Sequence, residues 1–318
     1  MTWIGRSLAA VAAVAVLHGL AWAYSTARLQ REVEARLDGL RRDGWIIQAE
    51  APSHAGWPFA AAVSYRRVAV DGAAAGVPAA WSADEASIVI RAAQPGTLLI
   101  VPSGVQRWRL AGSAWVPVTA ASFELAADGA GTGLSGREVV LHLPGGSVGL
   151  AGLQAHAAGR SLQVSLTGIE AAPFMDAGRA TLDAALTGPV PAAPDRAAAA
   201  AWRDGGGTVR VNSVTLEANG LAVSASGGGG LDANLQPMLD LMAQVRGYRA
   251  ALDRLVQAGA IPASTAVAAK AVLGLLSGRD ADAPAVVRLR LADAVASVAG
   301  FPLLRVPPLN WSPVPGQS

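Results

Sequence analysis

The sequence contains no cysteine, a single lysine and few charged residues of either sign. An exported chain without cysteine has no disulfides, so core burial alone must stabilise its fold. Arginine supplies 24 of the 25 basic residues, Lys270 is the exception, and the net charge is only +2. A nucleic-acid-binding protein needs positive charge clustered on one face. The composition therefore excludes a nucleic-acid partner, and its many glycines and prolines favour strands and turns over helical bundles.

Sequence motifs of the common cofactor-dependent enzymes are missing as well, since neither a P-loop nor a Rossmann fingerprint is present. Residues 145–149 match the pattern G-x-S-x-G with Ser147 as the nucleophile. A nucleophile elbow needs a helix after it, followed by an acid and then a histidine. His156 follows only nine residues later and leaves no room for the acid. We therefore interpret this segment as a Pro-Gly-Gly hairpin turn.

Metal ligands are equally sparse. His54, His142 and His156 are far apart in sequence and lack the spacing of a metal site. Asp280 and Asp282 stand near a helix end, but further oxygen ligands are not visible nearby. We predict no catalytic residue, no metal site and no cofactor.

The N-terminal stretch Leu8–Tyr24 has no formal charge over 17 residues, which is near the lower limit for a membrane-spanning helix. Arg6 before it favours a cytoplasmic N-terminus and export of the remainder. We expect residues 1–43 to form a membrane anchor and stalk helix. The protein would then be a single-pass inner-membrane protein with its bulk in the periplasm. As an alternative, Ala21-Trp22-Ala23 fits a signal-peptidase site, and cleavage after Ala23 would release a soluble periplasmic protein.

The helical pattern continues beyond that stretch. Leu29, Val33, Leu37 and Leu40 recur at spacings of four, four and three, which defines one helical face. This pattern predicts a helix that runs to about Arg42, where the uncleaved anchor would leave the membrane as a stalk.

From Trp45 to about Leu235 the dominant pattern is an alternation of apolar and polar residues. Leu162, Val164 and Leu166, for example, alternate with serine, glutamine and threonine. Such alternation predicts strands with one buried and one wet face, and therefore an antiparallel sheet. The Ala-rich segment within residues 189–207 is expected to be a helical excursion or a linker.

Towards the C-terminus the period changes. An apolar stripe from Met238 to Val256 has helical spacing, with Pro237 suited to the first turn and Gly259 to the end. A second helix is expected over 264–276, capped by Ser264 or Thr265, and then further strands. The fold we predict is mainly β: a long curved antiparallel sheet or flattened barrel over residues 44–318, with a helical insert at about 237–277.

Two Gly-aromatic-Pro units are predicted to form structural corners of this sheet, at Gly56-Trp57-Pro58 and Gly300-Phe301-Pro302. Glycine permits positive φ, and proline fixes its own φ and favours an extended residue before it. We expect both aromatic side chains to be buried and both units to flank strands of one sheet. As the alternative, the two rings would be exposed as ligand platforms.

These motifs resemble those of a bacterial family of inner-membrane-anchored periplasmic proteins known only as a domain of unknown function. The resemblance rests on the anchor, Gly44-Trp45, the first corner with the following Phe59, and Gly230-Leu231-Asp232. It continues with Ala258-Gly259 and an ending that runs from the second corner through Pro307-Pro308-Leu309 to Trp311. It implies location and fold, and no catalytic residue.

A sheet with one apolar face must bury that face against helices, against a second sheet or around lipid. We therefore expect a non-enzymatic binding or scaffolding protein for an apolar or amphipathic, lipid-like ligand or for another envelope protein. The alternatives are a serine hydrolase that uses Ser147 and a structural subunit of an inner-membrane complex. An open apolar groove would favour the lipid, and a closed core the scaffold.

Overall fold

The structure is a computed structural model that describes residues 2–74, 77–110, 114–143, 146–172, 175–188, 196–259, 261–277, 283–306 and 308–309. Of residues 2–14, 73–74, 77–78, 110 and 301–304 it describes the backbone alone. The helices are α1 (Thr2–Arg42), α2 (Arg196–Asp204), α3 (Tyr248–Gln257) and α4 (Ala263–Leu276). The strands are β1 (Ile46–Gln48), β2 (Ser53–Ala55), β3 (Ala60–Ala74), β4 (Val77–Arg91), β5 (Leu98–Leu110), β6 (Val116–Thr119), β7 (Ser122–Ala127), β8 (Thr132–Leu143), β9 (Gly146–Ala158), β10 (Ser161–Ala171), β11 (Met175–Leu186), β12 (Val209–Ala218), β13 (Leu221–Leu231), β14 (Pro237–Arg246), β15 (Ala285–Ala292), β16 (Val295–Val298) and β17 (Phe301–Arg305).

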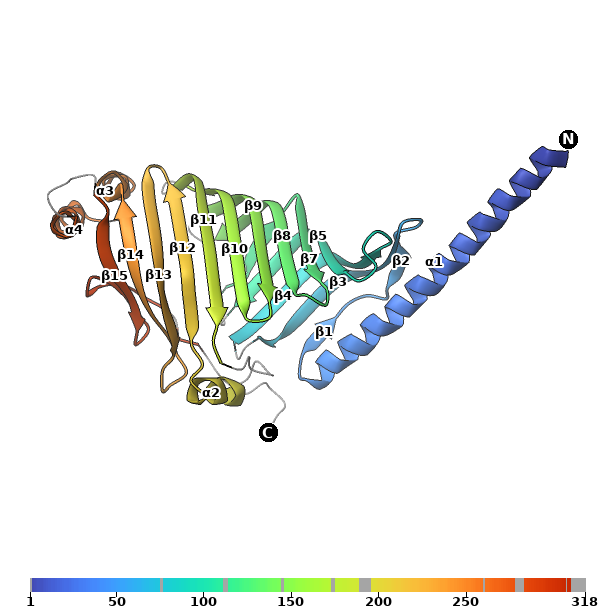
Figure 1. Ribbon diagram of the computed structural model, residues 1–318, viewed down its shortest axis with the longest axis horizontal. Coiled ribbons are helices and arrows are strands. Elements are labelled where there is room, and N and C mark those ends of the chain that lie inside the picture. Colours follow the sequence, from blue (N-terminus) through green and yellow to red (C-terminus); the bar gives the residue numbers. More distant parts are fainter. Residues whose placement is uncertain are drawn as a thin grey trace.

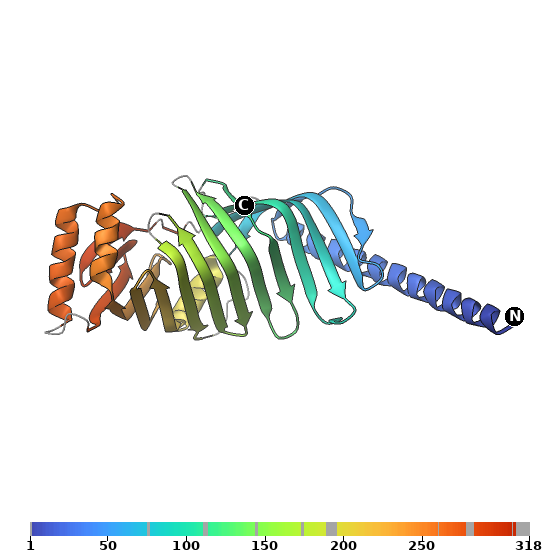
Figure 2. The same ribbon diagram turned by 90° about the horizontal axis from the view of Figure 1, so that it is seen from above.

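The strands form one large antiparallel sheet in which neighbours in the chain are neighbours in space. From β8 to β17 each strand pairs with the next one. Nearer the N-terminus, β1 and β2 both pair with β3, and β6 and β7 share the gap between β5 and β8. Figures 1 and 2 show a long curved band with α1 at one end and α3 and α4 at the other. The expectation of a mainly β, antiparallel fold is confirmed.

Helix α1 lies against the sheet instead of standing apart from it as a stalk. Leu29 and Val33 are 3% and 4% exposed and pack in one cluster with Val63, Tyr65 and Val68 of β3. The helix therefore uses the face predicted from its apolar spacing, but its partner is the sheet. Its N-terminal end projects beyond the sheet (Figure 1).

A glycine and a tryptophan fix the angle at which α1 ends. Gly44 adopts φ 89°, and the N–H groups of Gly44 and Trp45 donate hydrogen bonds to the carbonyl oxygens of Arg41 and Leu40. Glycine is preferred at such a helix end because positive φ carries no steric cost there. The Trp45 ring lies over Gly72 of β3, where an added Cβ would be 2.5 Å from the ring. The Gly44-Trp45 motif thus folds the chain back onto β3.

The first part of the predicted helical insert is wrong, because residues 237–246 form strand β14. Leu241 and Val245 are four residues apart, a spacing that fits both a helix and one face of a strand. In the structure they alternate with Met242 and Gln244, and β14 pairs with β13 and β15 on its two sides. Helix α3 begins only after Gly247, whose φ of 67° redirects the chain.

Helix α4 agrees with the predicted second helix, except that Pro262 is its N-cap and no side-chain cap is made. Helices α3 and α4 pack on each other and on the sheet, where Tyr248, Leu252 and Leu273 contact the buried Ala243 and Val287. This helical pair covers the end of the sheet opposite to α1.

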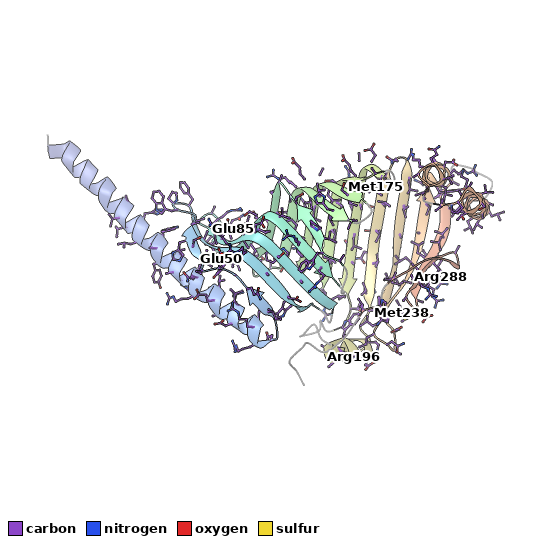
Figure 3. The ribbon with its side chains drawn as sticks, turned by 180° about the vertical axis from the view of Figure 1, so that it is seen from behind. Glu50, Glu85, Met175, Arg196, Met238 and Arg288 are labelled. Atoms are coloured by element: carbon purple, nitrogen blue, oxygen red, sulfur yellow. The ribbon has the colours of Figure 1, made fainter. Side chains whose placement is uncertain are left out.

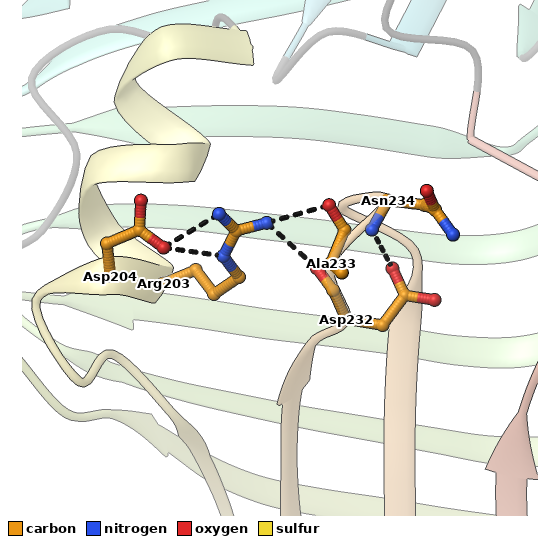
Figure 4. A network of polar contacts seen from close by, with 5 residues as sticks. All are labelled: Arg203, Asp204, Asp232, Ala233 and Asn234. Carbon is orange, nitrogen blue, oxygen red and sulfur yellow. Dashed lines mark hydrogen bonds and ion pairs between the residues drawn. The ribbon is translucent and has the colours of Figure 1, made fainter.

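Helix α2, within the predicted excursion, is tied to the turn between β13 and β14 (Figure 4). Arg203 Nη1 donates hydrogen bonds to the carbonyl oxygens of Asp232 and Ala233, at 3.1 and 3.0 Å. Asp232 Oδ1 in turn accepts hydrogen bonds from the backbone N–H groups of Asn234 and Gln236. The Gly-Leu-Asp motif therefore has a structural role, since its aspartate holds a turn on which α2 docks.

Candidate functional site

One row of apolar side chains crosses twelve strands of the sheet without interruption. Residues directly opposite each other in an antiparallel pair point to the same face, so the registers can be followed from strand to strand. Strands are about 4.8 Å apart, so eleven steps make the row about 50 Å long. From β3 to β15 the row consists of Val63, Ile88, Ile100, Leu125, Leu134, Ala155, Val164, Leu182, Val214, Ala225, Ala243 and Val287. We call this side of the sheet the apolar face.

The opposite side is polar over the same strands. Ser165 lies opposite Thr181, one residue away from the apolar pair Val164 and Leu182. From β7 to β14 the corresponding row consists of Glu124, Ser135, Gln154, Ser165, Thr181, Thr215, Ser224 and Gln244. The alternation read from the sequence therefore adds up to a sheet with two chemically distinct sides.

Helices cover the two ends of the apolar face but not its middle. Val63, under α1, is fully buried, and Val287, near α3 and α4, is 2% exposed. In the part of the chain that the structure describes, no helix packs extensively on β6 to β12. There Val164, Leu182 and Val214 are only partly buried, and Leu162 is 39% exposed. The middle of the apolar face is therefore partly exposed along this row, whereas Phe123, Val139, Leu150 and Ile169 nearer the strand ends are buried. We call the partly exposed stretch of the row, from β7 to β12, the apolar floor.

The surface area supports an open architecture. The accessible surface is 19012 Å², whereas a compact monomer of 32.1 kDa is expected to expose about 12,300 Å². The projecting α1 and the lack of a helical layer over the middle of the described sheet both contribute to this excess.

Bulges curve the sheet beside the floor. Glu138 and Gly168 adopt φ 50° and 57°, and the register of β10 with β11 shifts at Gly168. A bulge bends its strand and increases the local twist. Val139, Leu150 and Ile169 at this edge are buried although no helix packs extensively there among the described residues. They pack on one another and on Val118 and Phe123 in one cluster.

The described ion pairs between strands lie on the polar side. Arg91 reaches Glu124 at 2.9 Å, and Arg288 binds Asp240 through both carboxylate oxygens. The hydrogen bonds from Arg288 lower the pKa of the Asp240 carboxyl. Figure 3 shows Arg288 and Met238 at the end of the sheet opposite to Glu50 and Glu85.

Two polar side chains on the apolar face, Gln106 and Tyr65, are buried. Gln106 is 2% exposed, and its Oε1 accepts a hydrogen bond from Trp81 Nε1 at 3.2 Å. Burial raises the pKa of the Tyr65 hydroxyl, and the nearby Glu34 carboxylate raises it further. Tyr65 lies near α1, and Gln106 lies on β5 between Ala83 of β4 and Val118 of β6.

The prediction that Trp57 is buried is wrong, because its side chain is 60% exposed. The turn points the ring towards α1, where His18 and Trp57 are in edge-to-face contact with centroids 6.4 Å apart. Gly56 and Gly300 have φ of 92° and 86°, and the corner units stand at the starts of β3 and β17 in the same sheet. The side chains of Phe301 and Pro302 lie outside the described residues, so the predicted burial of Phe301 stays a prediction.

Ser147 is the second residue of β9, and the chain continues as that strand for eleven more residues, so the helix of a nucleophile elbow does not follow it. Its register partner on β8 is His142. Both side chains are on the polar face. Across the described residues, His, Asp and Glu side chains do not gather into a group of three that could hold a metal ion. Asp280 and Asp282 lie outside the described residues.

We expect the Ser147→Ala variant to leave both stability and function unchanged, with a melting temperature that reflects less than about 0.5 kcal/mol of difference. Ser147 is exposed at a strand end, so its hydroxyl stabilises little. The check is thermal unfolding together with hydrolysis of p-nitrophenyl esters of short and long acyl chains. Ester hydrolysis that the wild type performs and the folded variant lacks would establish the hydrolase alternative.

Sequence reasoning missed the residues that make the floor distinctive, because each of its side chains is ordinary in isolation. The continuous row appears only when eleven registers are known. Alternation fixed which residues share a face within each strand, but not which residues of different strands stand side by side.

The described part of the chain is thus an N-terminal helix docked on one large antiparallel sheet whose apolar side is only partly covered by helices. Residues 22–307 match the bacterial family described as "Uncharacterized protein conserved in bacteria (DUF2125)". The protein belongs to this family, as its resemblance to a domain of unknown function predicted. No curated protein and no solved structure matches it.

Proposed function

We propose that the protein is a membrane-anchored, periplasmic, non-enzymatic binding protein that holds a lipid-like, amphipathic ligand on the apolar floor. The observation that carries this proposal is the uninterrupted apolar row whose middle lies open. Leaving so much apolar surface in water is unfavourable by roughly 25 cal/mol per Å², so a partner that covers it is favoured. Large contiguous exposed apolar surfaces usually mark interaction sites.

The shape of the floor favours chain-like ligands. It is long, shallow and bordered on both ends by helices, whereas a compact ligand would be enclosed by a pocket. An acyl chain could lie along the row, with its polar head towards the strand ends or the solvent. A second envelope protein on the same surface is the scaffold alternative, and a subunit role in an inner-membrane complex is a special case of it.

The membrane anchor remains part of the proposal. Among the described residues no helix is both long enough and apolar enough to cross a bilayer. The side chains of residues 8–14, which make up the first part of the predicted span, are outside the description.

The proposal predicts that the Val164→Glu variant loses its ligand, whereas Ser165→Glu retains it. Both substitutions add one carboxylate to β10 at adjacent positions, but only the first places it on the floor. A charge in an apolar contact is costly, so we expect at least about tenfold less bound lipid for Val164→Glu.

The measurement is mass spectrometry of lipids that co-purify with the full-length protein from its native membrane. Thermal unfolding of both variants confirms that they fold. Equal lipid content in the two variants would contradict a ligand on the floor. Co-purification of a stoichiometric protein without lipid would favour the scaffold.

A further inference from the structure

We propose that the head of the ligand lies in a pocket between α1 and the start of the floor, and that this pocket selects a zwitterionic phospholipid head, in which an anionic phosphate stands beside a cationic amine. The inference rests on the proposed function, because it assigns the polar end of the same ligand. The pocket is formed by one face of α1, the turn at residues 95–97 between β4 and β5, and the end of β7. We call it the α1 pocket.

The walls of the α1 pocket are largely apolar. Leu29 and Val33 line it on the helix, and Ile90, Leu98 and Ala127 line it on the sheet. In the register Leu98 stands between Ile90 and Ala127, so these three side chains form one row on the apolar face. The pocket has a volume of about 340 Å³, at the lower end of the roughly 300–1,000 Å³ that is typical of ligand pockets. A pocket of this size suits the head and the first carbons of a lipid, and the rest of the ligand needs the floor.

Three charged side chains line the same pocket, namely Glu32, Arg36 and Asp128. At 100° per residue, Glu32 and Arg36 lie within about 60° of Leu29 around the helix axis, on the side that meets the sheet. Arg36 Nη2 is 2.9 Å from Glu32 Oε1. Asp128 follows β7, and its Oδ1 accepts hydrogen bonds from two backbone N–H groups of the turn to β8, at 2.8 and 3.0 Å. The turn therefore holds this carboxylate in a fixed position.

The signs of these charges favour a zwitterionic occupant. A purely anionic head would face two carboxylates, and a purely cationic head would face the guanidinium of Arg36. In a head with both charges, the phosphate pairs with Arg36 and the amine with Glu32 and Asp128. A guanidinium has five N–H donors, so the contact with Glu32 leaves donors for the phosphate. A charged head placed on the floor instead would lose its hydration without gaining a partner.

The α1 pocket is continuous with the floor. Ala127 stands two residues from Leu125, a member of the apolar row, and therefore on the same side of β7. From Ala127 the register leads through Thr132 and Ala157 to Leu162 of β10. These three partners are exposed, and the three strand steps cover about 14 Å. A chain attached to a head in the pocket thus reaches the middle of the floor over exposed side chains.

The test is a competition among three lipids that share the same acyl chains: zwitterionic phosphatidylethanolamine, anionic phosphatidylglycerol and uncharged diacylglycerol. Equal amounts are incubated with the full-length protein in a mild non-ionic detergent, and the lipids that stay bound after re-purification are quantified by mass spectrometry. The ratio within one sample does not depend on how much of the protein carries ligand. We expect the wild type to enrich phosphatidylethanolamine by about tenfold or more over each competitor, because hydrogen bonds between charged groups are strong.

Two variants test the two ends of the head separately. Arg36→Gln removes the partner of the phosphate, so the enrichment over diacylglycerol should fall by about tenfold. The double variant Glu32→Gln, Asp128→Asn removes both partners of the amine, and it should bind phosphatidylethanolamine and phosphatidylglycerol equally. Asparagine retains the Oδ1 acceptor that the turn needs. Arg31→Gln is the matched control, since Arg31 is exposed on the opposite side of α1, and it should keep the wild-type ratios.

Thermal unfolding checks that each variant folds, as expected because the Arg36 and Glu32 side chains are 68% and 55% exposed and such pairs stabilise little. Equal binding of the three lipids by the wild type, or a preference for phosphatidylglycerol, would overturn the inference and leave the floor as the ligand site. Wild-type ratios in both pocket variants would place the head elsewhere and overturn it as well. If the wild type binds none of the three lipids, the proposed function fails, and the assignment of the head fails with it.

Discussion

The Val33→Asp variant should lose most of the stability of the N-terminal end of the sheet. Val33 of α1 is 4% exposed and packs against side chains of β3. The new carboxylate would therefore be buried without a partner. Such burial costs several kcal/mol, a large share of the roughly 5–15 kcal/mol that typically separates folded from unfolded domains. The expected result is a strongly lowered melting temperature and rapid proteolysis near residues 43–45, where α1 turns back onto β3.

Ala35→Asp provides the matched control, because Ala35 is on the exposed side of the same helix. That variant should change the unfolding free energy by no more than about 0.5 kcal/mol. Equal melting temperatures for the two variants would mean that α1 is not docked on the sheet in solution.

Replacement of Gly247 by alanine is expected to have the second large effect. Gly247 adopts φ 67° between β14 and α3, and an added Cβ would lie 1.9 Å from the Gly220 carbonyl oxygen. The positive φ alone costs alanine roughly 1 kcal/mol, and the backbone contact forces the hairpin loop or the helix to move. We expect a total loss of about 3 kcal/mol or more, measured by denaturant unfolding.

Gly259→Ala separates the two contributions. Gly259 has nearly the same φ, 69°, but a Cβ added there would meet open space, with no atom beyond its chain neighbours within 4 Å. Only the conformational cost of about 1 kcal/mol should remain at this position. If both variants lose the same stability, the close approach to Gly220 plays no part.

The sequence predicted those features that depend on neighbouring residues, and it failed where the structure depends on contacts between distant segments. Period-two alternation is local, so the strands and the polar and apolar sides followed from residues such as Leu162, Val164 and Leu166. The Met238–Val256 stripe misled because a spacing of four fits both periods. Residues 237–246 form a strand because they pair with β13 on one side and with β15 on the other.

The turn at residues 56–59 shows a different limit of prediction from sequence. An aromatic ring between glycine and proline is usually expected in a core, and the pattern alone does not reveal what surrounds it. Here the docked helix takes the inner position, and His18 and Trp22 bind the carbonyl groups of the turn. Trp57 is therefore left outside by a contact between segments about 40 residues apart, which no local pattern encodes.

The nearest-neighbour order of the strands has a consequence for how such a protein can evolve. Because each strand pairs with the next in the chain, gain or loss of one whole hairpin would leave every other pairing intact and keep both sides of the sheet in phase. The apolar row would then change by about 10 Å, two strand spacings, at each such event. Insertion or deletion of whole hairpins would therefore lengthen or shorten the sheet among relatives of this chain without a change in its two-sided character.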